Sequence, residues 1–216
     1  MRPESTDVWR GQVLSGDRYV VQDKLGKGGM GTVYRAHDRH LDTLCVIKVP
    51  NLAVLSLPGF SERFVREIRS LVKLSYPHIV KINDVGQHEN IPFAVMQYLP
   101  GGELKDQRLR LPDGTLLASP VSSLAQWLPS IAKALDFVHG QGYVHRDVKP
   151  ANILFDAHRN AYLSDFGLVK VVAESSGPAQ RDLTTTGIIL GTPGFAAPEI
   201  SMGGHLTVAR INIHWR

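Results

Sequence analysis

Short apolar runs separated by turn residues fill the first half of the chain. Runs that are rich in β-branched and aromatic residues and bounded by glycine, proline, aspartate or asparagine favour β-strands. Five strands are expected, at Tyr19–Val21, Thr32–Ala36, Leu44–Val49, Ile79–Val85 and Pro92–Met96. This half of the chain is therefore predicted to form a β-sheet.

One helix is predicted between the third and the fourth of these runs. Its apolar residues recur at intervals of three and four, which is helical spacing; they are Phe64, Val65, Ile68, Leu71 and Val72. Ser61 precedes them and is a suitable N-cap.

The second half of the chain begins with a longer helical stripe. Its apolar positions step by three or four residues; they are Val121, Leu124, Leu128, Ile131, Leu135 and Val138. Pro129 lies inside the stripe and is expected to kink the helix or to move its start. Short strands are predicted around Val144, at Ile153–Phe155 and at Tyr162–Leu163.

Polar loops separate these elements. Lys105–Pro120 is predicted to be a loop or hairpin, and Gly167–Pro198 a long loop that contains the run Thr184–Thr186. A hinge is expected near Gln97–Gly102, where Pro100 precedes two glycines. A strand-rich first part and a helix-plus-loop second part predict an α+β fold with two lobes.

Composition limits the classes of protein to consider. The 216 residues carry a net charge of +4, and lysine and arginine are spread along the chain, so nucleic acid is not the expected partner. A basic cleft that attracts a phosphate-bearing ligand fits the charge equally well. Cys45 is the single cysteine, which suits a reducing cytoplasm. No apolar run is long enough to span a bilayer, and the polar N-terminus has no signal-peptide core.

A glycine-rich turn is the first candidate for chemistry. Gly26, Gly28 and Gly31 have the spacing G-x-G-x-x-G between two predicted strands, where backbone N–H groups could approach phosphates. An ordinary hairpin turn would explain this pattern as well. Lys48 ends an apolar strand, either as a partly buried cation that needs a partner or as a lysine that reaches solvent from an edge strand. Glu67 could supply the carboxylate, or could be a solvated residue of its helix.

The most specific stretch is Tyr143–Leu154. It places Asp147, Lys149 and Asn152 close together between apolar residues, a combination that suits a base, a phosphate contact and a metal ligand. A second carboxylate, Asp165, follows on a predicted tight turn, and Gly191–Glu199 closes the long loop.

Five motifs in order carry a family resemblance. They are the glycine loop, Val46-Ile47-Lys48, His145-Arg146-Asp147, Asp165-Phe166-Gly167 and Ala197-Pro198-Glu199. Between about Tyr19 and Ala209 the chain resembles a eukaryotic-type protein kinase domain. The sequence of its His145–Asn152 motif resembles that of the bacterial serine/threonine kinases of this family. The resemblance implies a bilobal protein-kinase-like fold with a β-rich N-lobe at 19–96 and an incomplete helical C-lobe at 97–209, flanked by an extension at 1–18 and a tail at 210–216.

The resemblance also implies an ATP site. Residues expected to contact ATP are Gly26, Lys27, Gly28, Gly31, Val33, Lys48, Gln97, Leu99 and Glu103. Lys48 would grip the α- and β-phosphates and pair with Glu67. Val33 and Ala36 would lie near the nucleotide, Met96 would be the gatekeeper, and Glu103 would contact the ribose.

Catalytic and regulatory roles follow from the same resemblance. Asp147 would accept the proton of a serine or threonine hydroxyl, Lys149 would steady the γ-phosphate, and Asn152 and Asp165 would hold Mg²⁺. Arg146 would pair with a phosphate on Thr184, Thr185 or Thr186, and Thr192 would lie in the substrate loop. His145, Phe166, Leu71 and Ile82 are expected in the core.

The family pattern ends abruptly at its C-terminal side. Arg210–Arg216 has neither the aspartate nor the glycine of the expected helix, which favours a shifted reading frame over a natural short form with its own seven-residue tail. Three functions stay open on the sequence: an ATP- and Mg²⁺-dependent kinase acting on serine or threonine of proteins, a non-catalytic nucleotide-binding or interaction module, and a small-molecule phosphotransferase. The Gly191–Glu199 segment speaks against the last.

Overall fold

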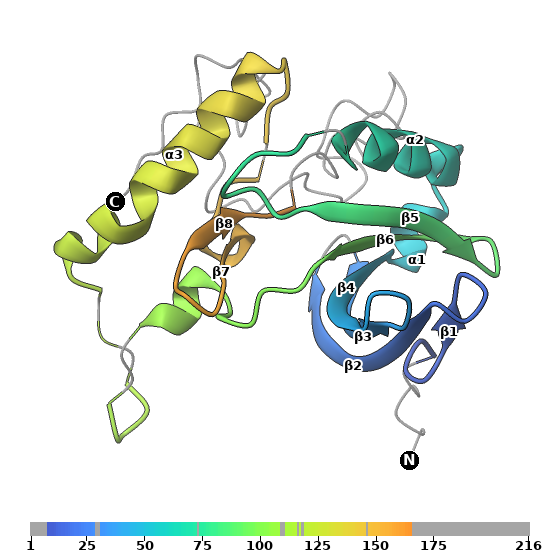
Figure 1. Ribbon diagram of the computed structural model, residues 1–216, viewed down its shortest axis with the longest axis horizontal. Coiled ribbons are helices and arrows are strands. Elements are labelled where there is room, and N and C mark those ends of the chain that lie inside the picture. The colour runs from blue at the N-terminus through green and yellow to red at the C-terminus, as the bar shows by residue number, and fades with distance from the viewer. Residues whose placement is uncertain are drawn as a thin grey trace. The chain divides into compact units, whose positions relative to one another are not determined.

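The chain divides into two compact units, shown in a computed structural model (Figure 1). The first unit comprises Met1–Lys73 and Lys81–Tyr98, and the second comprises Leu74–Val80 and Leu99–Arg216. The structure describes residues 8–28, 31–72, 74–108, 111–115, 117, 119–145 and 147–165. The predicted loop Gly167–Pro198, Phe166 and the tail after Ala209 lie outside these residues.

An antiparallel sheet forms the frame of the first unit. In the described residues its strand order is β1-β2-β3-β4-β6-β5. The strands are β1 Val13–Leu14, β2 Tyr19–Gly28, β3 Gly31–Asp38, β4 Thr43–Pro50, β5 Ile82–His88 and β6 Ile91–Gln97. All neighbouring pairs are antiparallel. The runs predicted as β2, β3, β4 and β6 are confirmed, and each strand is longer than its apolar run.

The two faces of this sheet bury different side chains. Along β3, Tyr34, Ala36 and Asp38 are buried while Val33, Arg35 and His37 are only half-buried, as expected for side chains that alternate between faces. One face holds a hydrophobic core, whose members include Tyr19, Tyr34, Ala36, Ile47 and Phe93. The opposite face contains Val33 and Lys48.

The residues before β2 are part of this unit. Val13 and Leu14 pair with Val20 and Tyr19, and Leu14 is 1% exposed. Trp9 packs against the same hydrophobic core, with its ring centroid 6.4 Å from that of Phe93. The chain therefore enters the fold well before Tyr19, although the family resemblance starts there.

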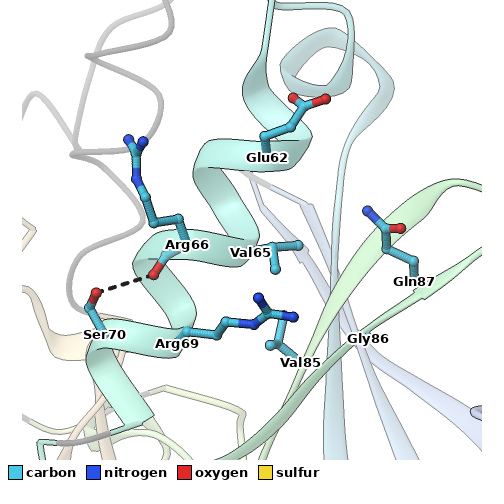
Figure 2. Close-up of a pocket in the computed structure, with 8 residues that line it drawn as sticks. All are labelled: Glu62, Val65, Arg66, Arg69, Ser70, Val85, Gly86 and Gln87. Atoms are coloured by element: carbon cyan, nitrogen blue, oxygen red, sulfur yellow. Dashed lines mark hydrogen bonds between the residues drawn. The ribbon is translucent and has the colours of Figure 1, made fainter.

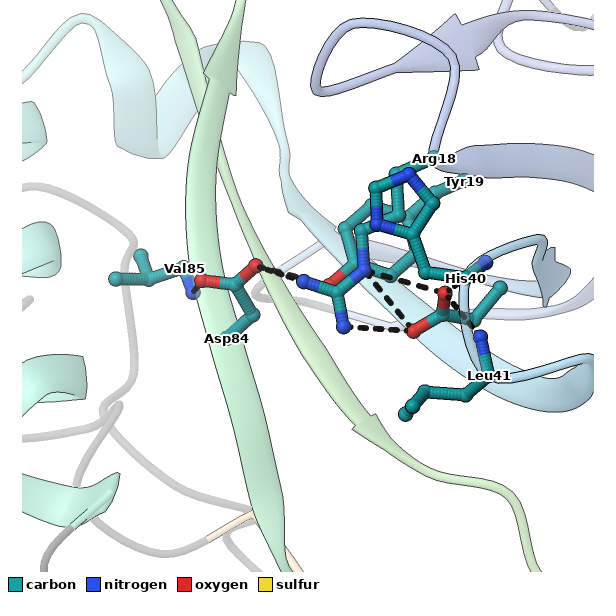
Figure 3. A network of polar contacts seen from close by, with 7 residues as sticks. Arg18, Tyr19, His40, Leu41, Asp84 and Val85 are labelled. Carbon is teal, nitrogen blue, oxygen red and sulfur yellow. Dashed lines mark hydrogen bonds and ion pairs between the residues drawn. The ribbon is translucent and has the colours of Figure 1, made fainter.

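A polar network joins three strands of the first unit (Figure 3). The Arg18 guanidinium donates to both carboxylate oxygens of Asp38, which is 3% exposed, and lies 3.5 Å from the Asp84 carboxylate. Tyr19 donates its hydroxyl to Asp84 at 2.8 Å, and burial together with that hydrogen bond raises the pKa of Tyr19. Hydrogen bonding from Arg18 lowers the pKa of Asp38. These contacts connect the start of β2 to the end of β3 and to β5.

Two helices follow β4. The short α1, Leu52–Leu55, is capped by the Asn51 side chain, which accepts a hydrogen bond from the Val54 amide. The predicted helix is α2, Phe60–Val72. Ser61 was expected as its N-cap, but the helix begins one residue earlier, with the Phe60 amide donating to the Leu57 carbonyl. Ser61 is therefore inside the helix, and this prediction was wrong.

The second unit contains the predicted long helix and a small strand pair. The helix α3, Leu124–Gly140, follows a 3₁₀ turn η2 at Val121–Ser123. Pro129 lies inside α3, five residues after its first residue, so it does not set the start of the helix, and it is exposed. Val121 is 82% exposed and lies before the helix, so the predicted stripe began one turn too early.

The strand pair consists of β7, Ile153–Phe155, and β8, Ala161–Leu163, as predicted. A 3₁₀ turn η3, Pro150–Asn152, precedes β7, and another, η1, spans Leu104–Gln107. The strand expected around Val144 does not form, because Tyr143–His145 has no strand partner among the described residues. No described helix combines the length and apolar character needed to cross a bilayer.

The connection between α2 and β5 belongs to the second unit. The Val80 amide donates to the Leu163 carbonyl, and the Leu163 amide donates to the His78 carbonyl. Tyr76 stacks on Phe137 of α3 with ring centroids 4.4 Å apart. The run Ile79–Val85 was predicted as one strand, but Ile79 and Val80 pair with β8, so β5 starts at Ile82. The β-rich first unit and the helix-containing second unit confirm the predicted α+β class.

Candidate functional site

The register of the first sheet aligns several predicted site residues. Gly26 pairs with Val33, Val33 with Lys48, and Lys48 with Ala94. Directly paired residues of antiparallel strands present their side chains on the same face. The glycine-rich turn, Val33 and Lys48 are thus parts of one cross-strand row, which leads from the β2–β3 turn to β6.

Ala36 does not belong to this row. It is fully buried in the hydrophobic core of the opposite face, together with Tyr34 and Cys45. The expectation that Ala36 lies near a nucleotide beside Val33 was therefore wrong, because the two positions differ by three along β3, and side chains an odd number of positions apart point to opposite faces. Burial raises the pKa of the Cys45 thiol to about 11, which keeps this side chain neutral.

The glycines of the β2–β3 turn differ in their surroundings. A Cβ atom at Gly31 would lie 2.1 Å from the Val49 carbonyl oxygen, so only glycine lets β3 approach β4 here. A Cβ at Gly26 or Gly28 would meet no atom of the described residues within 4 Å. Gly31 is thus required by the packing of the protein, whereas the two other glycines face open space. Lys27 between them is exposed.

Lys48 and Glu67 are both buried in the first unit. Lys48 is 7% exposed on β4, and Glu67 is 9% exposed on α2. The interpretation of Glu67 as a solvated helix residue is therefore excluded. A lysine at the end of an edge strand is excluded as well, because β4 lies between β3 and β6. Charged side chains this deeply buried are kept by interactions that satisfy them.

The end of β6 and the residues that follow it carry the side chains expected around adenine and ribose. Met96 is 8% exposed in β6, and Gln97 ends that strand opposite Cys45, with its amide donating to the Lys81 carbonyl. In the second unit, Leu99 is 8% exposed, and Glu103 precedes η1. The Glu103 carboxylate lies 2.7 Å from the Lys105 ammonium, an ion pair that the sequence had not indicated.

A compact polar cluster forms around Asp147 in the second unit. The Lys149 ammonium lies 2.8 Å from Asp147 Oδ2. The Asn152 side-chain amide donates to the Asp147 backbone carbonyl at 2.7 Å and to its Oδ2 at 3.1 Å. Because the Asn152 nitrogen is used in this way, its Oδ1 is the atom left to act as a ligand. The structure thus brings together the carboxylate, cation and amide that the sequence had placed within six residues.

Asp165 is held next to this cluster by the β7–β8 pair. Ile153 pairs with Leu163, so the residues just outside the pair, Asn152 and Ser164, are adjacent. The Ser164 amide donates to the Asn152 carbonyl at 2.8 Å, and the Ser164 hydroxyl donates to the same carbonyl at 3.2 Å. Asp165 follows directly. Its backbone φ is +63°, in the left-handed region that is uncommon for residues other than glycine.

His145 and Ser164 form a second link between the two stretches. The imidazole is 1% exposed, and burial lowers its pKa. Its Nδ1 accepts the Asp147 amide at 3.3 Å, which leaves Nε2 to carry the proton and donate to the Ser164 carbonyl at 2.8 Å. The expected core role of His145 is confirmed, as is the burial of Leu71 and Ile82. Ser164 was not singled out from the sequence; its signal was a polar residue between apolar β8 and Asp165.

The donor set around Asn152 and Asp165 suits a hard cation. An amide oxygen and a carboxylate are oxygen ligands of the kind that Mg²⁺ takes while it keeps several waters or phosphate oxygens. The predicted residues Arg146, Thr184, Thr185, Thr186 and Thr192 lie outside the residues that the structure describes.

Comparison with known proteins agrees with this geometry. Residues 19–210 match the protein kinase domain family. The serine/threonine-protein kinase PknL of Mycobacterium tuberculosis is 37% identical over 186 residues, which is 86% of this chain and 44% of PknL. The serine/threonine-protein kinase PknB of Mycobacterium leprae is 34% identical over 191 residues, which is 87% of this chain and 29% of PknB.

A probable serine/threonine-protein kinase, pknA2 of Bifidobacterium longum, is 34% identical over 195 residues, or 88% of this chain. The chain spans 24% of that protein, so it corresponds to a minor part of such relatives. Among solved structures, the M. tuberculosis PknI kinase domain superposes with a TM-score of 0.68 at 26% identity, covering 93% of this chain and 69% of that one. The chain therefore belongs to the protein kinase domain family.

Proposed function

We propose that this chain is the catalytic part of an ATP-dependent protein serine/threonine kinase, with Asp147 as the base. The observation that carries the proposal is the cluster of Asp147, Lys149 and Asn152, with Asp165 held beside it through Ser164. The names of the relatives, all serine/threonine-protein kinases, support the choice of a hydroxyl acceptor on a protein.

In the first unit, the proposed role is to hold the phosphates of ATP. Backbone N–H groups of the turn around Gly26, Lys27 and Gly28 would approach them, and open space at both glycines supports this. Lys48, in the same cross-strand row as Val33, would contact the α- and β-phosphates. Glu67 would pair with Lys48, since both are charged and buried in the same unit. Gly31 would keep the turn close to β4.

The adenine and ribose contacts are proposed for Gln97, Leu99 and Glu103. Leu99 offers a buried apolar side chain, and Gln97 offers backbone groups at the end of β6. The Glu103 carboxylate would accept a hydrogen bond from a ribose hydroxyl. The Lys105 ammonium, which contacts the same carboxylate in this structure, would compete with that hydroxyl.

The transfer step follows from the roles of the second unit. Asp147 would accept the proton of the substrate hydroxyl while that oxygen forms its bond to the γ-phosphorus and the bond to the β-phosphate oxygen breaks. Lys149 would donate to the γ-phosphate oxygens, and Asn152 Oδ1 and the Asp165 carboxylate would hold Mg²⁺. When bound, Mg²⁺ neutralises the charge that develops on the transferred and leaving oxygens. His145 and Ser164 would keep these groups in position.

Residues after Asp165 complete the proposal. Phosphate on Thr184, Thr185 or Thr186 would pair with Arg146, and Thr192 would help to seat the acceptor segment. These assignments rest on the motif pattern of the sequence.

The test is transfer of labelled phosphate from ATP to a generic acceptor protein, run beside a separate titration of ATP binding. Wild-type protein is expected to phosphorylate the acceptor in the presence of Mg²⁺. Asp147→Asn is expected to lose about 10²–10⁴-fold in transfer and to keep ATP binding. Asp136→Asn, on the exposed side of α3, is the matched control and should behave as wild type. Binding of ATP without any transfer by the wild type would contradict the proposal and indicate a nucleotide-binding module instead.

A further inference from the structure

Charged side chains gather outside the Asp147 cluster as well. In the first unit, several of them line a cavity between α2 and β5 (Figure 2), where the Ser70 hydroxyl donates to the Arg66 carbonyl of the same helix. In the second unit, Glu103 and Lys105 form an ion pair at the start of η1. None of the cavity-lining residues has a role in the proposed transfer reaction, whereas Glu103 is the proposed ribose contact. The ion pair therefore bears on the choice of nucleotide.

The backbone of Glu103 is fixed by the strand β7. The Gly101 amide donates to the Phe155 carbonyl at 2.8 Å, and Glu103 pairs with Leu154 in an antiparallel bridge. Leu154 follows the proposed Mg²⁺ ligand Asn152 by two residues. The same strand thus holds the backbone of the proposed ribose contact and continues from the turn that carries a proposed metal ligand.

The 3₁₀ turn η1 is held by its own contacts. The Asp106 carboxylate accepts a hydrogen bond from the Glu103 amide at 3.0 Å, and the Asp106 amide donates to the Glu103 carbonyl at 2.9 Å. The Gln107 side-chain amide donates to the Gly101 carbonyl at 2.7 Å. The Lys105 side chain takes no part in these contacts, so the turn does not depend on it.

Lys105 covers one oxygen of the Glu103 carboxylate. Its ammonium lies 2.7 Å from Glu103 Oε2, a close contact of opposite charges without the angles of a hydrogen bond. Although 32% of the Glu103 side chain is exposed, Oε2 is shielded from solvent. The Lys105 side chain itself is 60% exposed, and ion pairs of such exposed side chains are weak. The ammonium can therefore move into water at a small cost in free energy.

This arrangement limits what Glu103 can read on a sugar. A carboxylate has two acceptor oxygens, enough to accept a hydrogen bond from each of the two hydroxyls of a ribose. While Lys105 covers Oε2, the carboxylate offers a hydroxyl at most its other oxygen, Oε1. The positive charge beside the carboxylate also makes it a weaker acceptor. A second hydroxyl on the sugar then adds little to the free energy of binding.

We propose that Lys105 is a specificity-determining residue that makes the nucleotide site tolerant of the sugar, so that 2′-deoxyATP is bound nearly as well as ATP. This inference rests on the proposed function, because it takes Glu103 as the ribose contact. Without Lys105, both carboxylate oxygens are available to the ribose. ATP then binds more tightly, and the site distinguishes the two nucleotides.

The test is isothermal titration calorimetry of the full chain with ATP and with 2′-deoxyATP, each in the presence of Mg²⁺. Wild type is expected to bind the two nucleotides with affinities within about twofold of each other. Lys105→Met should bind ATP about threefold more tightly, the size of effect that an exposed ion pair supports, and leave the affinity for 2′-deoxyATP unchanged. Lys105→Gln should repeat this result.

Two further variants serve as controls. Lys133→Met replaces an exposed lysine of α3 and should bind both nucleotides as wild type. In a Glu103→Ala background, Lys105→Met should no longer change the affinity for ATP. An effect that persists without Glu103 would overturn the proposal, because Lys105 would then act by another route. Thermal unfolding checks that each variant is folded.

The remaining outcomes separate this inference from the proposed function. An unchanged ratio of the two affinities in Lys105→Met, or a wild type that prefers ATP by more than tenfold, would overturn the role of Lys105 even if the protein transfers phosphate. The expected ratios in a protein that transfers no phosphate would support the role of Lys105 and contradict the kinase activity. Failure to bind either nucleotide would overturn both.

Discussion

The imidazole of His145 and the backbone carbonyl of Ser164 are joined by a 2.8 Å hydrogen bond inside the second unit. The same ring accepts the Asp147 amide at 3.3 Å. One buried side chain thus connects the stretch that carries the proposed base to the stretch that carries Asp165.

Replacement of His145 by phenylalanine removes both hydrogen bonds and keeps a ring in place. We expect His145→Phe to lower the free energy of unfolding by about 1–3 kcal/mol, because a buried donor and acceptor lose their partners. Phosphate transfer should fall while ATP affinity is retained. Urea unfolding, transfer assays and ATP titration measure the three effects; unchanged stability would contradict the proposed link.

The same residue makes stability depend on pH. Burial lowers the pKa of His145 in the folded protein below its ordinary value of 6.5. The unfolded chain therefore binds a proton that the folded chain does not, so the stabilisation is complete above pH 6.5 and is lost as pH falls below it. The decrease in unfolding free energy between pH 7.5 and pH 5.5 should be smaller in His145→Phe than in wild type. Parallel pH profiles would show that His145 does not titrate on unfolding.

The network around Asp38 predicts that Asp38→Asn lowers the free energy of unfolding more than Asp42→Asn does. Asp38→Asn removes the charge that holds Arg18 and should cost about 1.5–3 kcal/mol of unfolding free energy. Asp42→Asn is the control, because the Asp42 side chain is 94% exposed and surface changes of this kind stay within about 0.5 kcal/mol. The lowered pKa of Asp38 means that its contribution is present above pH 3.8 and is lost as pH falls further. Equal losses in urea unfolding would argue against the network.

Substitutions at two glycines of the β2–β3 turn should have different effects, one on protein stability and the other on ATP binding. Gly31→Ala places a Cβ atom against the Val49 carbonyl and should destabilise the protein by about 1–3 kcal/mol. Gly28→Ala adds a Cβ that meets no atom of the part of the chain that the structure describes within 4 Å, so stability should hold while ATP affinity falls about tenfold if phosphates pass close to the backbone. Thermal unfolding and nucleotide titration check both; a destabilised Gly28→Ala protein would contradict the geometry.

Phosphorylation of the threonine cluster is also expected. Each phosphate adds about −1.5 to −2 charges at neutral pH, which Arg146 could pair with. Phosphopeptide mapping of active protein should find at least one of Thr184, Thr185 and Thr186 modified, and replacing all three by alanine should lower transfer. Active protein with all three unmodified would refute this expectation.

Local sequence patterns predicted much of the fold. Strand pairings between residues far apart in the sequence could not be predicted in this way. The runs that became β2, β3, β4 and β6 have strand composition of their own, so they could be found from the sequence. Ile79 and Val80 have the same composition, but they pair with Leu163, more than eighty residues away. Nothing within the run marks that choice, and β5 was therefore placed too early.

The candidate site divides in the same way. Asp147, Lys149 and Asn152 are close in sequence, so their contacts could be expected. The cross-strand row of Gly26, Val33 and Lys48 depends on sheet register, and the wrong placement of Ala36 shows that spacing alone did not fix it. The burial of Glu67 depends on how α2 packs. The polar residues next to it in the sequence suggested an exposed side of the helix, so this burial could not be predicted.

The excursion of Leu74–Val80 into the second unit has a consequence for dissecting this protein. The first unit is not one stretch of chain, because this segment interrupts it between α2 and β5. A fragment ending at Tyr98 would hold all strands of the larger sheet, yet it would carry Ile79 and Val80, each 4% exposed in the whole protein, without the β8 strand that they pair with. A stable isolated unit would instead need the excursion replaced by a short polar linker, so that Ile79 and Val80 are not left without the strand that covers them.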